Sequence, residues 1–479
     1  MSWRKHAAAM AAIVLVLGVV SIWFGERIGI NAGQGWDGLS YMHWSDEFWH
    51  RVVEVGVTKY QAQRVLPSLL VYITAHPLGV TPSVAHHLVA FMLLDLAMLL
   101  GACVLWAHLA LRVMSWRPVV AWVGFVALFG SFANARHALY DPVLGDPTAF
   151  FLGMLMTWGF LARKPWAVWL AGLAGAFTWP PLWPAACALL LFPQPREPIA
   201  VAAARWPKIV AAALAVGATA FLVYNGFIYR GDPVPGIGDE KLIAWVRDDL
   251  LWLTVPLFAA QLAVGWYLLG RDRRVWKPHV WLPALAGTAV IYGLRAYWIH
   301  KVGNDEPGPT FVQFVGENTL EMLRGPLWGL VHHIVYYGPI VAVALLAWPR
   351  VCAVVAEWGT GAAICAATIV AFSAASESRQ WIHLFPLLVV LALAATAESW
   401  TPRRALVFTA LALAWSKLWF KIGFDEIHGH HEQPDQGYFM NHGPYASDRS
   451  WLIHLVAAAI TVVAIRWLLG ARRAASPAP

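Results

Sequence analysis

Long apolar segments separated by short polar ones make up most of the 479-residue sequence. An α-helix rises ~1.5 Å per residue, so ~20 apolar residues cross the ~30 Å hydrocarbon core of a bilayer. Fourteen segments are long enough, or nearly so, to be such helices. They cover residues 6–24, 84–111, 118–133, 147–162, 166–178, 179–192, 206–229, 249–269, 279–298, 333–348, 351–373, 381–398, 405–421 and 451–469. We expect an all-α, polytopic membrane protein with about 14 spans, within a range of 11 to 15.

A fifteenth apolar segment, VLPSLLVYITAHPLG at 65–79, is shorter. It would cover only ~22 Å, and Pro67 and Pro77 bracket it, so we interpret it as a juxtamembrane or re-entrant helix. Residues 25–83 then form a long first outer loop that contains amphipathic and juxtamembrane helices. The first apolar run lacks a small-x-small cleavage site, so we expect it to be retained as a span. The whole chain, 1–479, is expected to be a single integral membrane domain without a separate soluble domain.

Positive charge supports this topology. The predicted inner segments hold 18 of the 34 Lys and Arg residues, whereas the outer loops, about three times as long in total, hold 12. This bias is the positive-inside rule, and it places both termini in the cytoplasm. The net charge of +7 therefore reports topology and does not indicate a nucleic-acid partner. The composition agrees, because 59% of the residues are hydrophobic and only 13% are charged.

Acidic residues are distributed in the opposite way. Counting Asp249 with the outer loop it adjoins, the outer side holds 22 of the 27 Asp and Glu residues, a clustering that the positive-inside rule does not require. Two explanations remain open at this point. The outer loops are longer and wetter, or polar chemistry takes place at the outer face.

The first outer loop carries the stretch GQGWDGLSY, with Asp37 among three glycines and Tyr41 four residues later, and Arg64 lies ahead of LPSLL. GQGWDG satisfies the G-x-G-x-x-G pattern but follows a membrane span and opens no βαβ unit, so it does not indicate a dinucleotide site. Glycines let a backbone turn tightly and approach a ligand. A surface turn and a binding site are both compatible with Asp37.

Two further outer segments concentrate ionisable groups. In NARHALYDPVLGDPTAFF, Arg136, His137, Asp141 and Asp146 fall just before a span. Asp146 precedes a proline, so a helix-capping role is an alternative to a binding site. In SESRQWIHLFP, Glu377 and Arg379 stand where a span enters the outer leaflet. Arginine binds phosphate in a bidentate manner, although interfacial snorkelling also places arginines there.

Other polar features give weaker signals. His428, His430, His431 and Glu432 match no zinc spacing, so we expect neither a metal nor another cofactor. Asp95 is an acid within a span, which marks either a buried pair or a transport path. The outer loops at 299–332 and 422–450 are long enough to form a lid or an acceptor cleft.

Four of these motifs carry a resemblance to a known class. They are WDGLSY, QRVLPSLL, YDPVLGDPTAFF and ESRQWIHLFPLL. Together with the layout of the spans, the chain resembles the GT-C class of integral membrane glycosyltransferases, which includes protein mannosyltransferases and aminoarabinose transferases. Members with a paired acidic motif in the first loop carry two adjacent carboxylates, whereas Asp37 is followed by Gly38. This departure argues against a metal-dependent variant.

The resemblance implies transfer of a sugar from a polyprenyl-phosphate donor to a lipid or glycan acceptor, with inversion, at the outer face of the bacterial inner membrane. Asp37 is the expected base and Asp141 or Asp146 the expected second carboxylate. The expected phosphate and substrate ligands are Tyr41, Arg64, Arg136, His137, Glu377 and Arg379. A transporter or flippase of lipid-linked sugars, or a non-catalytic subunit of envelope polysaccharide assembly, remains the alternative.

Overall fold

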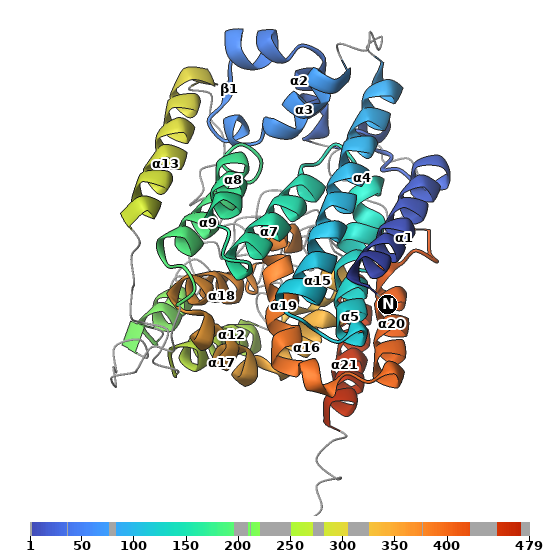
Figure 1. Cartoon of the computed structure of the whole chain (residues 1–479), viewed down its shortest axis with the longest axis vertical. Coiled ribbons are helices and arrows are strands. Elements are labelled where there is room, and N and C mark those ends of the chain that lie inside the picture. Colours follow the sequence, from blue (N-terminus) through green and yellow to red (C-terminus); the bar gives the residue numbers. More distant parts are fainter. Residues whose placement is uncertain are drawn as a thin grey trace, which may run out of the picture.

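The computed structural model describes residues 2–35, 37–75, 83–195, 209–210, 212–220, 251–271, 282–304, 325–375, 377–421 and 448–470. Helices dominate these residues and pack side by side as one bundle around a large apolar core (Figure 1). The prediction of an all-α fold is confirmed except for one short strand pair. The predicted lid loops lie largely outside the described residues, as does the whole histidine cluster at 428–432.

Five helical segments of the described chain are long and apolar enough to cross a membrane, or up to seven if two bent helix pairs each form one span. The five are Trp3–Phe24, Val84–Val113, Leu253–Arg271, Ser378–Ser399 and Trp451–Gly470. The prediction of an integral membrane protein is confirmed by these segments. The predicted number of about 14 spans is not confirmed.

The difference between the predicted spans and the observed helices is clearest where long apolar segments are divided into short helices. The predicted spans 333–348 and 351–373 become four helices instead of two. These are α15 (Trp328–Tyr337), α16 (Ile340–Leu346), α17 (Trp348–Trp358) and α18 (Thr360–Phe372). Gly338 and Gly359 adopt left-handed φ values of +78° and +91°, which end α15 and α17, and α16 and α17 are bent by 84°. Hydropathy alone does not register such backbone breaks.

The remaining helices of the bundle are also often shorter than the apolar segments that predicted them. They are α1 (Trp3–Phe24), α4 (Val84–His108), α5 (Pro118–Phe129), α6 (Ala138–Tyr140), α7 (Asp146–Leu161), α8 (Pro165–Gly175), α9 (Leu182–Leu191), α12 (Leu251–Arg271), α13 (Leu282–Val302), α19 (Phe385–Thr396), α20 (Pro402–Ser416) and α21 (Asp448–Gly470). A π-helical turn, η6 (Ala133–His137), precedes α6, and a 3₁₀ helix, η10 (Ser378–Leu384), precedes α19.

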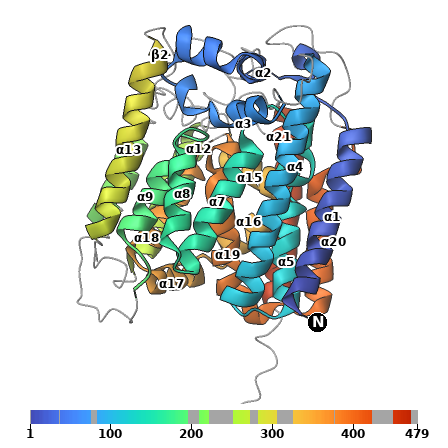
Figure 2. The same cartoon turned by 45° about the horizontal axis from the view of Figure 1, so that its top comes forward.

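The first loop forms a separate layer at one end of the bundle, over α7 and α8 (Figures 1 and 2). Its elements are α2 (Gly38–Asp46), η2 (Trp49–Glu54), β1 (Val57–Thr58), η3 (Gln61–Gln63) and α3 (Leu66–Ala75). Several of its apolar side chains, Trp44, Phe48 and Val52 among them, form a second, smaller core together with residues of α4, α13 and the turn before α7. The short helix predicted at 65–79 is therefore present as the ten-residue α3. We refer to this end of the molecule as the first-loop end.

The first loop is also tied to α13 at the edge of the molecule. β1 pairs in parallel with β2 (Gly303–Asn304), which directly follows α13. Both figures show α13 standing at the outside of the bundle, with its end at the first-loop layer (Figures 1 and 2). This contact joins segments that lie more than 200 residues apart in the sequence.

Candidate active site

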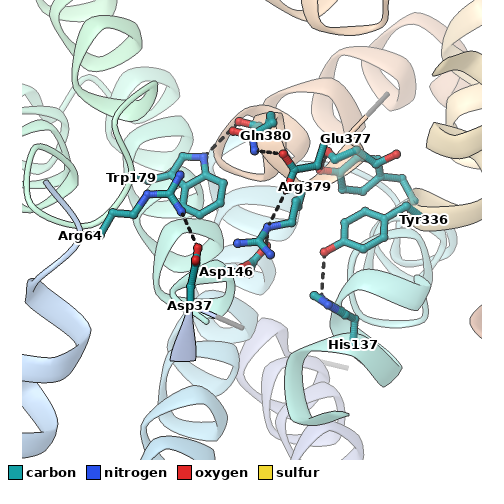
Figure 3. Close-up of polar contacts among 11 residues, drawn as sticks. Asp37, Arg64, His137, Asp146, Trp179, Tyr336, Glu377, Arg379 and Gln380 are labelled. Atoms are coloured by element: carbon teal, nitrogen blue, oxygen red, sulfur yellow. Dashed lines mark hydrogen bonds and ion pairs between the residues drawn. The ribbon is translucent and has the colours of Figure 1, made fainter. Parts of the chain in front are cut away.

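Charged side chains from three distant segments meet at the first-loop end (Figure 3). The first loop contributes Asp37 and Arg64, the start of α7 contributes Asp146, and the segment around η10 contributes Glu377 and Arg379. We call these five residues the arginine–carboxylate cluster. All five were predicted as site residues from separate motifs, and the structure brings them together.

Arg379 links the two buried carboxylates of the cluster. Its Nε lies 3.4 Å from Oδ1 of Asp146 and 3.4 Å from Oε1 of Glu377, and its side chain is only 5% exposed. Gln380 donates a hydrogen bond to the other oxygen of Glu377, and the indole nitrogen of Trp179 donates to the carbonyl oxygen of Gln380 at 3.0 Å. The guanidinium is thus held in one place, and interfacial snorkelling does not describe a side chain that is buried in this way.

Asp146 does not cap α7. Gly145 is the N-cap residue, Asp146 is the first residue of the helix, and no side-chain capping hydrogen bond is made there. The carboxylate faces Arg379 instead. The capping alternative considered from the Asp-Pro sequence is therefore wrong.

Arg64 and Asp37 form the more open half of the cluster. The closest approach between Arg64 Nη1 and Asp37 Oδ2 is 4.0 Å. The Arg64 guanidinium lies 4.3 Å from the centroid of the Tyr60 ring and 5.0 Å from that of Trp179, and Trp179 also contacts Arg379 at 5.6 Å. The Asp37 side chain is 56% exposed, against 3% for Asp146 and 12% for Glu377. Asp37 is therefore the carboxylate of the cluster that an incoming molecule can reach.

Tyr41 lies one helical turn after Asp37 and is buried beside Arg64. Burial raises the pKa of its phenol, the charge of Asp37 acts in the same direction, and Arg64 opposes both through its charge and a side-chain hydrogen bond. Tyr41 is thus kept neutral next to the two charged groups. Its ring also packs on Trp44, with the centroids 5.1 Å apart.

Asp141 lies in the turn between α6 and α7 and is 2% exposed. Its carboxylate abuts Gly35, where a Cβ atom would come within 2.8 Å of Oδ1 and where φ is +74°, so only glycine fits this approach. Burial raises the pKa of Asp141 to about 8; Arg379 opposes this rise, while Asp146 and Asp37 add to it. Asp141 is therefore mostly protonated at neutral pH and is not a second negative charge there.

Arg136 and His137 are placed differently from the cluster. Arg136 forms an ion pair with Glu26 and also donates to the carbonyl oxygen of Phe420. Nδ1 of His137 lies 3.1 Å from the hydroxyl of Tyr336, at the side of the site (Figure 3). The recorded contacts of Arg136 are therefore with Glu26 and Phe420, and its role as a phosphate ligand stays a prediction.

Several residues that shape the site were missed from the sequence. Trp179 stands in the turn between α8 and α9, where tryptophan is typical of a membrane interface. From α15, His333 hydrogen bonds the hydroxyl of Ser378 at 2.9 Å, and the hydroxyl of Tyr337 donates to the Ser378 carbonyl oxygen at 2.7 Å. These contacts fix the segment that carries Glu377 and Arg379. No pattern in the apolar sequence of α15 indicates them.

The chain is similar in structure to an archaeal oligosaccharyltransferase. That structure is AglB from Archaeoglobus fulgidus, in complex with an inhibitory peptide and a dolichol-phosphate; the TM-score is 0.43 and the sequence identity 13%. The similarity covers 100% of this chain and 57% of that chain, so this protein spans little more than half the length of the one it matches. No family model and no curated protein sequence matches the chain.

The described residues contain no group of three or more His, Cys, Asp or Glu side chains arranged to hold a metal ion. The charged groups of the cluster are two guanidiniums and three carboxylates. Guanidiniums bind phosphate oxygens through paired hydrogen bonds, and an exposed carboxylate can accept a proton. The arrangement can therefore bind an anionic group and deprotonate a neighbouring hydroxyl or amine.

Proposed function

We propose that the protein is a membrane glycosyltransferase of the GT-C type, which moves a sugar from a polyprenyl-phosphate donor to a lipid or glycan acceptor. The observation that carries this proposal is the convergence of Arg64 and Arg379 with the exposed carboxylate of Asp37 at one end of the bundle. A displacement at a sugar phosphate needs positive charge at the leaving group and a base at the nucleophile. The cluster supplies both.

Asp37 is the base in this proposal. It accepts the proton of the acceptor hydroxyl or amine as that group attacks the anomeric carbon. The bond from that carbon to the phosphate oxygen breaks, and the electron pair leaves with the polyprenyl phosphate. One such displacement inverts the configuration at the anomeric carbon.

Arg64 and Arg379 bind the phosphate of the donor and stabilise the charge that develops on it. Asp146 and Glu377 hold Arg379 in position from two sides. We place this reaction at the outer face of a bacterial inner membrane because the acidic residues cluster on the side that the positive-inside rule assigns as outer.

Replacing Asp37 by Asn tests the proposal. The change keeps the size of the side chain and removes the base, so the rate of sugar transfer should fall by roughly 10² to 10⁴. The measurement is kcat with a polyprenyl-phosphate-linked sugar and the purified full-length chain. Asp46→Asn makes the same chemical change at the end of α2, away from the cluster, and should leave kcat unchanged.

Two results would count against this assignment. Transfer at full rate by the Asp37→Asn protein would exclude Asp37 as the base. Movement of a lipid-linked sugar across sealed vesicles, without any transfer and without dependence on Asp37, would favour the flippase alternative.

A further inference from the structure

A third arginine lies close to the cluster but belongs to the edge of the bundle. Arg295 is in α13, seven residues before its end at Val302, which places it ~10 Å along the helix from the first-loop end. Its Nε and Nη2 donate to Oε1 of Gln63 at 3.2 and 2.6 Å. Its guanidinium lies 5.2 Å from the centroid of the Trp183 ring.

The recorded contacts of Arg295 do not neutralise its positive charge. Gln63 is neutral and accepts two of the five N–H groups of the guanidinium. Among the described residues, no carboxylate pairs with Arg295. A guanidinium with unused N–H groups can bind the oxygens of an external phosphate through paired hydrogen bonds.

The surroundings of Arg295 face the outside of the bundle. Tyr292, one turn earlier on α13, is 57% exposed while its ring packs on Trp183 at 6.3 Å. Leu294 and Tyr297 on the same helix are exposed as well. α13 stands at the edge of the molecule in both views (Figures 1 and 2). Arg295 therefore lies beside exposed apolar side chains on the outer face of α13.

The same surface leads inward to the cluster. Gln63, which binds Arg295, is followed directly by Arg64, which approaches Asp37. Trp179 lies in the turn between α8 and α9, and Trp183 lies in the first turn of α9. Trp183 contacts Arg295, and Trp179 contacts Arg64 and Arg379. One short segment thus connects three arginines, from the exposed edge to the buried carboxylates.

We propose that Arg295, seated on Trp183, is a separate binding site for the phosphate of a polyprenyl phosphate that lies along the exposed face of α13. From this site the headgroup reaches Arg64 and Arg379. The identity of the carrier rests on the proposed function. A lipid phosphate fits better than a free phosphate because the site adjoins an apolar helix face that a polyprenyl chain can cover.

The competing explanation is that Arg295 only ties the first loop to α13 through Gln63. Two substitutions of Gln63 separate these roles. Gln63→Glu keeps and strengthens the tie but neutralises the guanidinium, whereas Gln63→Ala breaks the tie and leaves the charge free. If Arg295 binds the lipid phosphate, Gln63→Glu should lose binding of the lipid probe and Gln63→Ala should retain it. If Arg295 only holds the first loop against α13, Gln63→Ala should lose binding of the probe and Gln63→Glu should retain it.

The probe is a photoactivatable farnesyl phosphate, crosslinked to the full-length chain in nanodiscs and mapped by mass spectrometry. We expect labelling of α13 in the unmodified protein and about a tenfold loss at subsaturating probe in Arg295→Gln and in Gln63→Glu. Lys301→Gln, which removes an exposed charge from the same helix, should label normally. Equal labelling of α13 in the unmodified, Arg295→Gln and Gln63→Glu proteins would overturn the proposal.

Competition identifies the source of the phosphate. Unlabelled farnesyl phosphate should suppress the crosslink, whereas equal suppression by inorganic phosphate or by phosphatidylglycerol would overturn a site for the carrier. The assay does not depend on catalysis. If labelling depends on Arg295 but the protein transfers no sugar, the proposed function alone is refuted. If the protein transfers sugar but labelling does not depend on Arg295, this inference alone is refuted.

Discussion

At the scale of single residues, Asp141 shows how its surroundings set the charge of a group. Its carboxylate is buried against Gly35, and neither oxygen has a hydrogen-bond partner among the described residues. Burial raises the pKa of Asp141 from its ordinary value of 3.8 to about 8. Asp146, only five residues later, instead faces a guanidinium. Two acids of one short loop therefore have different electrostatic surroundings.

The difference between the folded and unfolded pKa values of Asp141 predicts a pH dependence of the free energy of unfolding. Between the unfolded pKa of 3.8 and the folded pKa of about 8, the folded chain keeps a proton on Asp141 that the unfolded chain releases. The contribution of Asp141 to the free energy of unfolding should therefore fall as pH rises through this window and level off above it. Asp141→Asn should remove that part of the dependence. The thermal midpoint in detergent, measured from about pH 5 to about pH 9, gives the comparison.

The control for this experiment is Asp46→Asn, which should keep the pH dependence of the unmodified protein. The protonated carboxyl of Asp141 should also give an infrared C=O stretching band at neutral pH that Asp141→Asn lacks. A band and a pH profile unchanged by Asp141→Asn would show that Asp141 is ionised in the folded protein.

At the scale of elements, α7 and η10 determine the distance between Asp146 and Arg379. Gly153 lies two helical turns after Asp146, on the same face of α7. A Cβ atom at Gly153 would overlap the backbone of His383 in η10, so the two elements are in backbone contact. His383 in turn is four residues from Arg379. The glycine at position 153 of the apolar helix α7 thus helps to set the geometry of the site.

Gly153→Ala should therefore separate α7 from η10. We expect a loss of stability of about 1–3 kcal/mol from overpacking, together with reduced sugar transfer. Gly293→Ala is the matched control, because a Cβ atom at Gly293 in α13 meets nothing within 4 Å. Alanine is also the better helix former, so this variant should be as stable as the unmodified protein or more so. Thermal midpoints of the two variants in detergent, read together with transfer rates, test the contact.

At the scale of the whole molecule, the proposed function requires the first loop to face away from the cytoplasm. Glu54 lies in η2 at the first-loop end, and Lys164 lies in the exposed turn between α7 and α8. In intact cells, a membrane-impermeant maleimide should label Glu54→Cys directly and Lys164→Cys only after permeabilisation. The four native cysteines are buried and should give little background. The reverse pattern would contradict both the topology and the proposed face of reaction.

Much of the architecture was predictable from the sequence. Apolar length indicated a helical membrane protein, and the short segment at 65–79 is the short helix α3. The number of spans was not predictable in the same way. Gly338 and Gly359 end helices inside continuous apolar runs, and a count based on hydropathy does not respond to backbone dihedral angles.

The residues of the candidate site could be named from sequence motifs, but their arrangement in space could not be predicted. Asp37, Arg64, Asp146, Glu377 and Arg379 were named because ionisable groups in the predicted outer loops between apolar segments are conspicuous. The grouping of these five, and the separate pairing of Arg136 with Glu26, depend on which loops pack together. Trp179 and Tyr337 were missed for the same reason, since an aromatic residue in an apolar segment carries no sign of its tertiary partner.

The sequence by itself determined the class of molecule, a helical membrane protein, and the residue types available for chemistry, because these follow from local apolarity and charge. Only the tertiary structure decided which charges face one another. It buried Asp141 against Gly35, left Asp37 open, and set Arg295 at the edge of α13. Such outcomes depend on contacts between segments far apart in the chain, and burial and charge pairing act only once those contacts exist.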